Sequence, residues 1–321
     1  MHIHPSLTTL ALLASAELPI RTIYQFASND TWLENLAVRS NGIILATEIG
    51  PPANLLAFNP RSPFPPKNHP TYLRLRPRPL RHHEAAHDIF YITGANTTSA
   101  NIGDPLTNTT HVWRVDFTGN ANSTNPNVTL IARPTAPTGF NGLAAFNETI
   151  ILAVDTTTGY TWEAIKDEDL MSSLNGLKVQ DGFVYWTAGG DFCRARLYDN
   201  VTAGPGEVIA QGTSFDDYAV APDGFRAASG RKYAYAATAA QNPVMEISFD
   251  LEGGRNRTEV VAGDLDSTEI AEPTGCAFGR EKGEANVSVI AYVKLSSQYL
   301  TLETNHHDQD LATQNGEFDF M

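Results

Sequence analysis

The chain alternates short runs of hydrophobic residues with turns rich in Gly, Asn, Asp and Pro. In the clearest runs, hydrophobic and polar positions alternate or β-rich residues stand together, which is typical of strands. No amphipathic stretch of helical period exceeds about three turns, and the best helix candidate, residues 161–174, is short and interrupted. The pattern therefore predicts an all-β fold made of many short strands.

The strands recur in a fixed unit. Each unit opens with polar residues, continues as an alternating strand, turns at Gly, Asn or Asp, and returns as further short strands. Four copies are clear and two are weaker; they begin at Glu34, Asn141, Asn175, Asp216, about Arg81 and Thr274. Such a repeat indicates a β-propeller, whose blades of four strands surround a central channel. We therefore expect one six-bladed β-propeller over residues 17–300.

The two ends of the chain differ from the repeats. A short apolar run is followed by Ala14-Ser15-Ala16, which predicts a secretory signal over residues 1–16. Neither this run nor any other reaches the roughly 20 apolar residues of a membrane span. Gln298–Met321 lacks a clear final strand, and residues 301–321 are expected to be a polar tail. Either the strand at Arg21–Phe26 closes the ring or the tail is disordered.

Asn-x-Ser/Thr triplets support passage through the secretory pathway. One such triplet is weak, but many behind a signal-like start favour a secreted, N-glycosylated protein. The candidate glycosylation sites are Asn29, Asn96, Asn108, Asn122, Asn127, Asn147, Asn200, Asn256 and Asn286.

The charge restricts the partners. With 22 Lys and Arg against 36 Asp and Glu, the formal charge is −14, which disfavours nucleic acid and anionic membrane surfaces. One basic cluster, Arg74, Arg76, Arg78 and Arg81, is expected on an exposed edge strand or loop. Cys193 and Cys276 permit at most one disulfide, and whether they meet is left open.

A zinc-protease motif, H-E-x-x-H, occurs at His83–His87. That chemistry needs a helix, where the two His side chains share one face. Here the strand-like residues 89–92 follow almost at once. On a strand, residues four apart lie about 13 Å from each other, so the pair would not chelate one ion. The motif is interpreted as a coincidence.

The first residues of the units are the better candidates for a site. In a propeller they lie at the channel mouth, so Glu34, Asn141, Asn175 and Asp216 should converge. Two carboxylates and two amide oxygens suit Ca²⁺ or Mg²⁺, which could polarise a carbonyl or activate a water. The alternative is that these side chains only satisfy backbone groups at strand starts.

Aromatic residues accompany this ring in the sequence. An apolar wall with a few polar groups is the usual form of a pocket for organic ligands. The candidates for such a wall can equally belong to the core between blades. They are Trp32, Phe140, Trp186, Phe215 and Tyr218.

Several segments resemble a fungal branch of the gluconolactonase/luciferin-regenerating-enzyme superfamily. The resemblance covers roughly residues 21–295 and implies a six-bladed propeller. The segments that carry it are Thr31–Gly42, His111–Asp116, Asn175–Val179 and Glu272–Arg280.

The resemblance implies two activities. In the lactonases of the superfamily a divalent metal would be held by Glu34, Asn175 and Asp216, with Asn141 beside the substrate. Those enzymes commonly carry an acidic residue where this chain has Thr187-Ala188.

The closer likeness is to the hetero-Diels–Alderases of fungal tropolone–sesquiterpenoid biosynthesis, which join an o-quinone methide to a humulene-type alkene. On that reading small hydrophobic molecules are the substrates and no cofactor is required. Glu34, Asp216 and Asn141 would be catalytic, and Trp32, Phe140, Trp186 and Tyr218 would line the pocket. We favour this pericyclase; the alternatives are a metal-dependent lactonase and a non-catalytic binding propeller.

Overall fold

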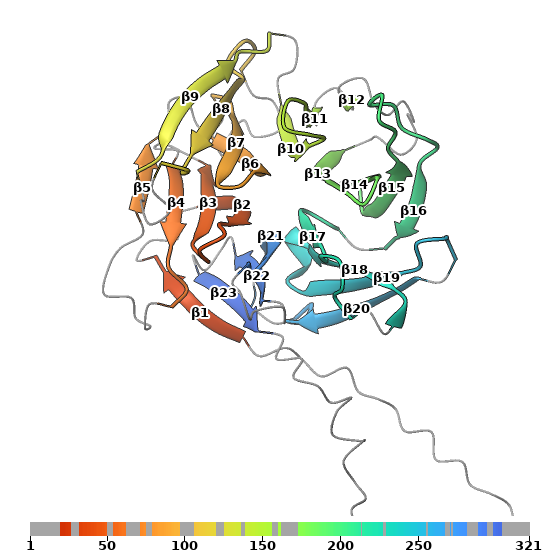
Figure 1. The fold of residues 1–321 in the computed structure, drawn as a ribbon. Coiled ribbons are helices and arrows are strands. Elements are labelled where there is room, and N and C mark those ends of the chain that lie inside the picture. Colours follow the sequence, from red (N-terminus) through yellow and green to blue (C-terminus); the bar gives the residue numbers. More distant parts are fainter. Residues whose placement is uncertain are drawn as a thin grey trace, which may run out of the picture.

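The computed structural model consists almost entirely of antiparallel β-sheet. The described residues form six sheets arranged around a common axis (Figure 1), and the prediction of an all-β propeller is confirmed. The structure describes residues 20–26, 32–49, 54–61, 71–74, 79–96, 106–119, 125–135, 139–155, 160–161, 173–212, 214–226, 229–254, 256–266, 270, 272–280, 288–293 and 298–303.

We call the sheets blades 1 to 6 and give their strands from the axis outwards. Blade 1 contains β2 (Trp32–Val38), β3 (Ile44–Ile49), β4 (Asn54–Phe58) and β5 (Thr71–Arg74). Blade 2 contains β6 (Pro79–Ala86), β7 (Ile89–Gly94), β8 (His111–Asp116) and β9 (Asn127–Ala132). In the described residues, blade 3 contains β10 (Phe140–Ala145), β11 (Ile151–Asp155) and β12 (Tyr160–Thr161).

Blade 4 contains β13 (Leu174–Gln180), β14 (Phe183–Ala188), β15 (Asp191–Arg196) and β16 (Glu207–Ala210). Blade 5 contains β17 (Tyr218–Val220), β18 (Lys232–Ala237), β19 (Val244–Phe249) and β20 (Asn256–Ala262), with a 3₁₀ turn at Ala239–Gln241. Blade 6 contains β21 (Pro273–Phe278), β22 (Ser288–Val293), β23 (Gln298–Glu303) and β1 (Ile20–Gln25). Most of the helix candidate at 161–174 lies outside the described residues.

The innermost strands form a closed ring. Each of β2, β6, β10, β13, β17 and β21 contacts the innermost strand of the next blade, and β21 contacts β2. Their first residues are neighbours: Gly142 lies against Asn175, and Asp217 N donates to Thr274 O. We call the side where these strands begin the mouth face and the opposite side the far face.

The N-terminal strand closes blade 6. β1 pairs antiparallel with β23, with Ile20 opposite Leu302 and Gln25 opposite Gln298, so the expected role of Arg21–Phe26 is confirmed. The expectation that Gln298–Met321 lacks a final strand is wrong for Gln298–Glu303, which pairs on both sides with β22 and β1. Strand structure thus extends beyond residue 300. Residues 1–19 and 304–321, with the predicted signal and the rest of the tail, lie outside the described residues.

A bulge recurs near the start of the innermost strands. The pairing register with the second strand shifts between Leu33 and Asn35, Phe140 and Leu143, Leu174 and Leu177, and Pro273 and Cys276. A bulge adds an unpaired residue and redirects the side chains around it. The polar residues that open the repeat unit lie in these bulges, which gives the repeat its structural meaning.

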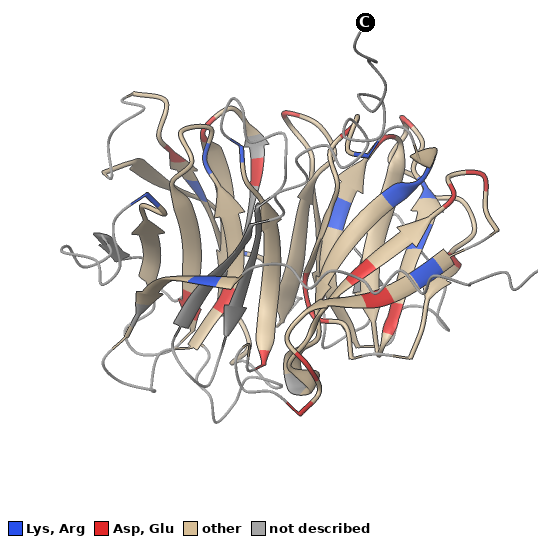
Figure 2. Ribbon diagram, turned by 90° about the horizontal axis from the view of Figure 1, so that it is seen from below, with Lys and Arg blue, Asp and Glu red and all other residues tan. Residues whose placement is uncertain are grey.

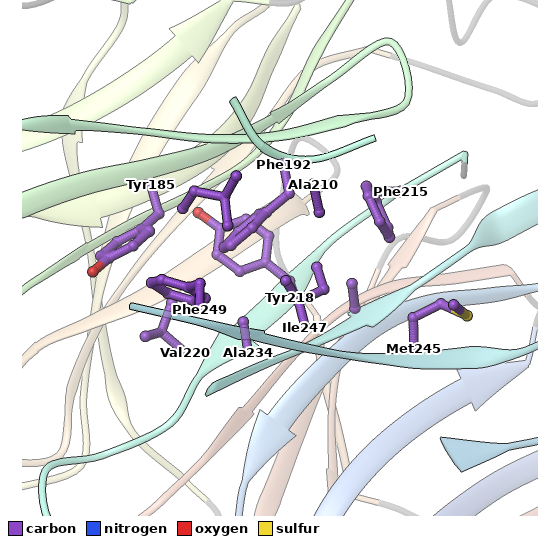
Figure 3. Close-up of a cluster of buried hydrophobic side chains, with 12 residues drawn as sticks. Tyr185, Phe192, Ala210, Phe215, Tyr218, Val220, Ala234, Met245, Ile247 and Phe249 are labelled. Atoms are coloured by element: carbon purple, nitrogen blue, oxygen red, sulfur yellow. The ribbon is translucent and has the colours of Figure 1, made fainter. Parts of the chain in front are cut away.

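Hydrophobic side chains fill the spaces between blades. Figure 3 shows one cluster, to which blade 4 contributes Tyr185 and Phe192 and blade 5 contributes Tyr218 and Phe249. Phe192 and Tyr218 meet edge to face with their ring centroids 4.8 Å apart. Such offset aromatic contacts add to the stabilisation from area burial.

The two cysteines do not meet. Cys193 is buried in blade 4, Cys276 in blade 6, and both are free thiols. Burial raises the pKa of the Cys276 thiol well above its usual value, which makes the reactive thiolate scarce. Both residues therefore act as small core side chains.

Ionic contacts join blades at the far face. Arg39, after β2, makes two hydrogen bonds to Asp88 of blade 2, at 2.9 and 3.2 Å, and both side chains are buried. Arg280, after β21, pairs with Glu84 of blade 2 across blade 1. In Figure 2, Lys and Arg positions are scattered among Asp and Glu positions in the described part of the chain.

The zinc-protease motif lies on a strand and a turn. His83 is in β6, opposite Tyr91, and His87 follows in the exposed turn before β7. The strand that we predicted from the following hydrophobic run is present, so the motif lacks the helix that zinc chelation needs. Within the basic cluster, Arg74 ends the edge strand β5, as expected, but Arg81 is on the innermost strand β6, so that part of the prediction is wrong. Arg76 and Arg78 lie outside the described residues.

Blade contact at the bulge predicts a strict requirement for glycine at position 142. A Cβ atom there would lie 2.5 Å from the backbone nitrogen of Leu177 and 2.6 Å from the carbonyl oxygen of Asn175. Neither backbone atom can move without separating β10 from β13. We expect Gly142→Ala to lower the free energy of unfolding by about 1–3 kcal/mol, measured by urea denaturation.

Gly119→Ala is the matched control, because a Cβ at Gly119 would meet no atom within 4 Å. Equal unfolding midpoints for the two variants would contradict the close contact between blades 3 and 4.

Candidate functional site

The four residues predicted to form a ring occupy equivalent places. Glu34, Asn141 and Asn175 lie in the bulges of β2, β10 and β13, and Asp216 lies two residues before β17. All four are at the mouth-face end of the innermost strands. Glu34 and Asp216 are buried, whereas Asn141 and Asn175 are partly exposed.

In blades 1 and 5, the residue after the predicted one makes a contact across the axis. Asn35 Nδ2, in blade 1, donates a 2.6 Å hydrogen bond to Asp217 Oδ2, in blade 5. Blades 1 and 5 are separated by blade 6, so their side chains meet inside the ring rather than along a blade interface. This hydrogen bond therefore lies at the axis.

A lysine from a third blade completes the contact. Lys178 Nζ, on β13 of blade 4, donates to Asp217 Oδ1 at 2.8 Å and to Oδ2 at 3.0 Å. The Asp217 side chain is fully buried and that of Lys178 is 21% exposed. We call Asn35, Lys178 and Asp217 the axial network. A buried carboxylate is costly unless charged and hydrogen-bonding partners surround it, and this network supplies both.

Backbone hydrogen bonds fix the carboxylate in place. Asp217 N donates to Thr274 O at 3.3 Å, and Ala237 N donates to Asp217 O at 3.0 Å. Thr274 Oγ1 in turn donates to Leu33 O at 3.0 Å. The backbone on both sides of the axial network is thus tied to blades 5, 6 and 1.

Thr187 forms a hydrogen-bonded bridge between two blades. Its buried hydroxyl accepts a hydrogen bond from Gly176 N at 2.9 Å and donates one to Asp216 O at 2.7 Å. The side chain joins blade 4 to blade 5 and carries no charge. At this position β14 therefore contributes a neutral structural side chain.

The structure explains why a glycine follows Asn175. A Cβ at Gly176 would lie 2.5 Å from Asp217 Oδ1 and 2.9 Å from the Tyr218 ring. The space beside Gly176 is occupied by the axial carboxylate. Asn175 can carry a side chain because it precedes the crowded position.

Glu34 and Asn141 each place an oxygen atom at the mouth-face end of the innermost strands. Trp32 Nε1 donates to Glu34 Oε2 at 2.8 Å, so this tryptophan orients a carboxylate. Asn141 Oδ1 is buried and has no hydrogen-bond partner among the described residues. An unsatisfied buried oxygen is unfavourable unless a ligand, ion or water supplies a partner. Asn141 is therefore a candidate ligand contact.

The prediction of an aromatic wall needs correction. Trp186 and Tyr218 are fully buried, Phe215 and Phe140 nearly so, and all four pack in hydrophobic clusters. They fill the space between strands and blades, as the alternative interpretation proposed, and leave little surface for a ligand. Burial also raises the pKa of the Tyr218 phenol well above its usual value. Of the five aromatic candidates, Trp32 alone is partly exposed.

Sequence reasoning missed Asn35, Lys178 and Asp217. Two of them directly follow a predicted site residue, and the Asp216-Asp217 pair was visible in the sequence. Which member of each pair reaches the axis depends on the local backbone register, which for Glu34 and Asn35 is set by a bulge. A one-residue shift in register exchanges the two faces of a strand. The repeat alone carries no such information.

Metal-ligand residues do not gather in a larger cluster. In the described part of the chain, no group of three or more His, Cys, Asp or Glu side chains is placed to hold a metal ion. A site with fewer carboxylates, completed by amide oxygens, would have to be built from Glu34, Asp216 and the neighbouring Asn residues. As regards membranes, none of the described helices is long and apolar enough to cross one.

Comparisons with known proteins do not identify a family for this chain. No family model matches the chain, and no curated protein matches it. A catalytically inactive virginiamycin B lyase from Staphylococcus aureus, with quinupristin, is 11% identical with a TM-score of 0.47, covering 91% of this chain and 90% of that one.

A nidogen/laminin complex is 15% identical with a TM-score of 0.41, covering 84% and 91%. A functionally unknown protein from Desulfotomaculum acetoxidans is 11% identical with a TM-score of 0.43, covering 73% and 72%. Similarity at this level supports no conclusion about activity. The class is set by the chain itself: a β-propeller with a polar network at its axis.

The axial network predicts that the Asp217 charge stabilises the fold. Asp217→Asn keeps the shape but turns one acceptor into a donor that faces Lys178 or Asn35. We expect a loss of about 3 kcal/mol in the free energy of unfolding, and a smaller loss when Lys178→Met is added. Urea denaturation of the variants and the parent measures both.

Glu259→Gln is the control for a surface pair, because its partner Arg257 is 65% exposed. Such pairs contribute about 0–1 kcal/mol. Equal losses in Asp217→Asn and Glu259→Gln would show that the axial charge has no special role.

Proposed function

We propose that the chain is a pericyclase of the hetero-Diels–Alderase type, which joins a quinone-methide-like diene to a terpene alkene at the channel mouth. The observation that carries the proposal is the axial network: a lysine ammonium held by a buried carboxylate at the axis. Asp217 is the hydrogen-bond partner of Lys178 among the described residues. An ammonium group has three donors, so it retains capacity to bind a substrate oxygen.

The reaction demands orientation and one well-placed donor. Holding diene and alkene in reacting geometry removes part of the entropic barrier. Negative charge grows on the quinone-methide oxygen as the new ring forms, and the Lys178 ammonium would donate to it. Asp217 holds Lys178, and Asn35 holds Asp217, so both act as positioning residues in this proposal.

Formation of the quinone methide from a benzylic alcohol requires the loss of water. Glu34 in its protonated form would give a proton to the leaving hydroxyl, and Asp216 would take the phenolic proton. One water leaves and the two proton transfers balance. Trp32 orients Glu34 for this step through its 2.8 Å hydrogen bond. The substrates are small and hydrophobic, and no cofactor takes part.

A second candidate is a metal-dependent lactonase, favoured by the unsatisfied Asn141 Oδ1. An oxygen-rich set of this kind fits a hard divalent cation. Glu34, Asn175 and Asp216 would hold Ca²⁺ or Mg²⁺, and Asn141 would contact the substrate. When bound, the ion would polarise the lactone carbonyl. Against this candidate, the position after the Asn-Gly strand holds the uncharged bridge Thr187.

Variants of Lys178 test whether this side chain accelerates the proposed pericyclic reaction. With an o-quinone methide precursor and a humulene-type alkene, we expect Lys178→Met to lower kcat by about 10²–10³-fold, the usual loss for one oxyanion donor. Lys178→Arg should recover part of the rate, because it restores a charged donor. Chromatography with mass detection of the cycloadduct gives the rates.

Lys232→Met is the matched control, since Lys232 is a buried lysine paired with Asp181 at the far face. Similar losses in Lys178→Met and Lys232→Met would indicate a structural effect and would count against the proposal. Ligand binding without turnover of either substrate class would indicate a binding propeller.

Variants of Glu34 and Asp216 distinguish a metal-dependent lactonase from a pericyclase. In a lactonase, Glu34→Ala or Asp216→Ala should remove both the metal and nearly all hydrolysis, because the remaining ligands cannot hold the ion. In the pericyclase, each of these substitutions should lower the rate by about 10²–10⁴-fold, and formation of the cycloadduct should be insensitive to EDTA. Metal analysis of the purified protein, with lactone hydrolysis assayed before and after EDTA, decides between them.

A further inference from the structure

The candidate glycosylation sites are unevenly distributed over the propeller. Six of the nine Asn-x-Ser/Thr asparagines are among the described residues, and all six are exposed: Asn96, Asn108, Asn127, Asn147, Asn200 and Asn256. Asn29, Asn122 and Asn286 lie outside the described residues. Exposure is necessary for a glycan, and the strand pairings show which face each site occupies.

Four of the six sites are at the far face. Asn147 is in the turn between β10 and β11, and Asn200 is in the connection between β15 and β16. Asn127 begins β9 opposite Asp116, and Asn256 begins β20 opposite Phe249. The other two, Asn96 and Asn108, are both in the β7–β8 connection on the mouth side of one blade.

Asn147 and Asn200 share a local geometry suited to carrying a sugar. Asn147 Oδ1 accepts hydrogen bonds of 2.9 Å from Thr149 N and from Thr149 Oγ1. Asn200 Oδ1 accepts from Thr202 N at 3.2 Å and from Thr202 Oγ1 at 2.7 Å. In both sites, the side-chain oxygen accepts hydrogen bonds from the backbone N–H and the hydroxyl of the Thr in its own triplet. The amide nitrogen on the opposite branch of the planar group is therefore directed away.

The amide nitrogen distinguishes these sites from Asn256. Within the described part of the chain, Nδ2 of Asn147 and Nδ2 of Asn200 donate no hydrogen bond, so a sugar there disturbs no internal contact. Asn256 Nδ2 instead donates to Ile209 O, between β20 and β16. A sugar on that nitrogen would have to fit between two strands.

Asn127 lies beside an apolar edge. All six residues of β9 are exposed, including Val128, Leu130 and Ile131. An exposed, uncharged edge strand can pair with another chain, and proteins usually protect such edges. A bulky, hydrated glycan on the first residue of β9 would obstruct that pairing.

We propose that N-linked glycans on Asn127, Asn147 and Asn200 cover the far face of the propeller, and that Asn256 stays unmodified. In each transfer, Nδ2 forms a bond to the anomeric carbon of an oligosaccharide. The bond from that carbon to the lipid-linked pyrophosphate donor breaks, and the Nδ2 proton is released as the pyrophosphate leaves. With these glycans in place, the far face excludes protein partners.

The test is glycopeptide mapping of the full-length chain secreted from a eukaryotic host under its own N-terminal segment. Peptide-N-glycosidase in ¹⁸O-water converts each modified Asn to labelled Asp, which mass spectrometry locates. We expect label at Asn127, Asn147 and Asn200 and none at Asn256. Unlabelled Asn147 and Asn200, a label at Asn256 in their place, or failure of the chain to be secreted would overturn the proposal.

Two variants distinguish the effect of losing the glycan from the effect of changing the turn. Asn147→Asp keeps the oxygen acceptor but removes the attachment nitrogen, and it equals the product of enzymatic deglycosylation. It should lose one glycan, and after enzymatic deglycosylation of both proteins its Tm should equal that of the parent. Thr149→Ser keeps both hydroxyl and triplet, and should retain the glycan. An unchanged glycan count in Asn147→Asp would overturn the assignment of that site.

Discussion

The buried carboxylate of Asp217 constrains the centre of the molecule. A charge without water must be matched by donors, and here those donors come from two other blades, through Asn35 and Lys178. The backbone of Asp217 is also bound to Thr274 of blade 6. Blades 1, 4, 5 and 6 therefore cannot shift independently at the mouth-face level. The same requirement forces Gly176 to have no side chain, because the carboxylate occupies that space.

The sequence is informative where structure is local. Alternating strands and turns at Gly, Asn and Asp depend on neighbours a few residues away, so the all-β propeller could be predicted from the repeat. The last strand of blade 6 could not. β23 follows and precedes polar segments, and it becomes a strand because β22 and β1 pair with it on either side. Its structure depends on residues from the opposite end of the chain.

The repeat did not reveal which polar side chains meet across the axis. The repeat led to Glu34 and Asp216, whereas the contact across the axis uses Asn35 and Asp217. In blade 1 a bulge decides which of two adjacent side chains faces the axis, and its register is set by the pairing of β2 with β3. In blade 5 the choice is made just before β17, where the backbone of Asp217 is bound to Thr274 and Ala237. The aromatic residues were misplaced for a related reason. Trp186 and Tyr218 alternate towards the spaces between blades, where hydrophobic burial outweighs any role at the channel.

The pairing of β1 with β23 has a consequence for how the chain acquires its structure. During synthesis β1 emerges first, but its partner, which includes Leu302 opposite Ile20, emerges after all the other strands. Until then β1 has no partner, and the edge of β22 in blade 6 is unpaired. Contacts so distant in sequence slow folding, and open edges favour association between chains. The interval between the first and the last strand is therefore the period in which a nascent chain most needs protection.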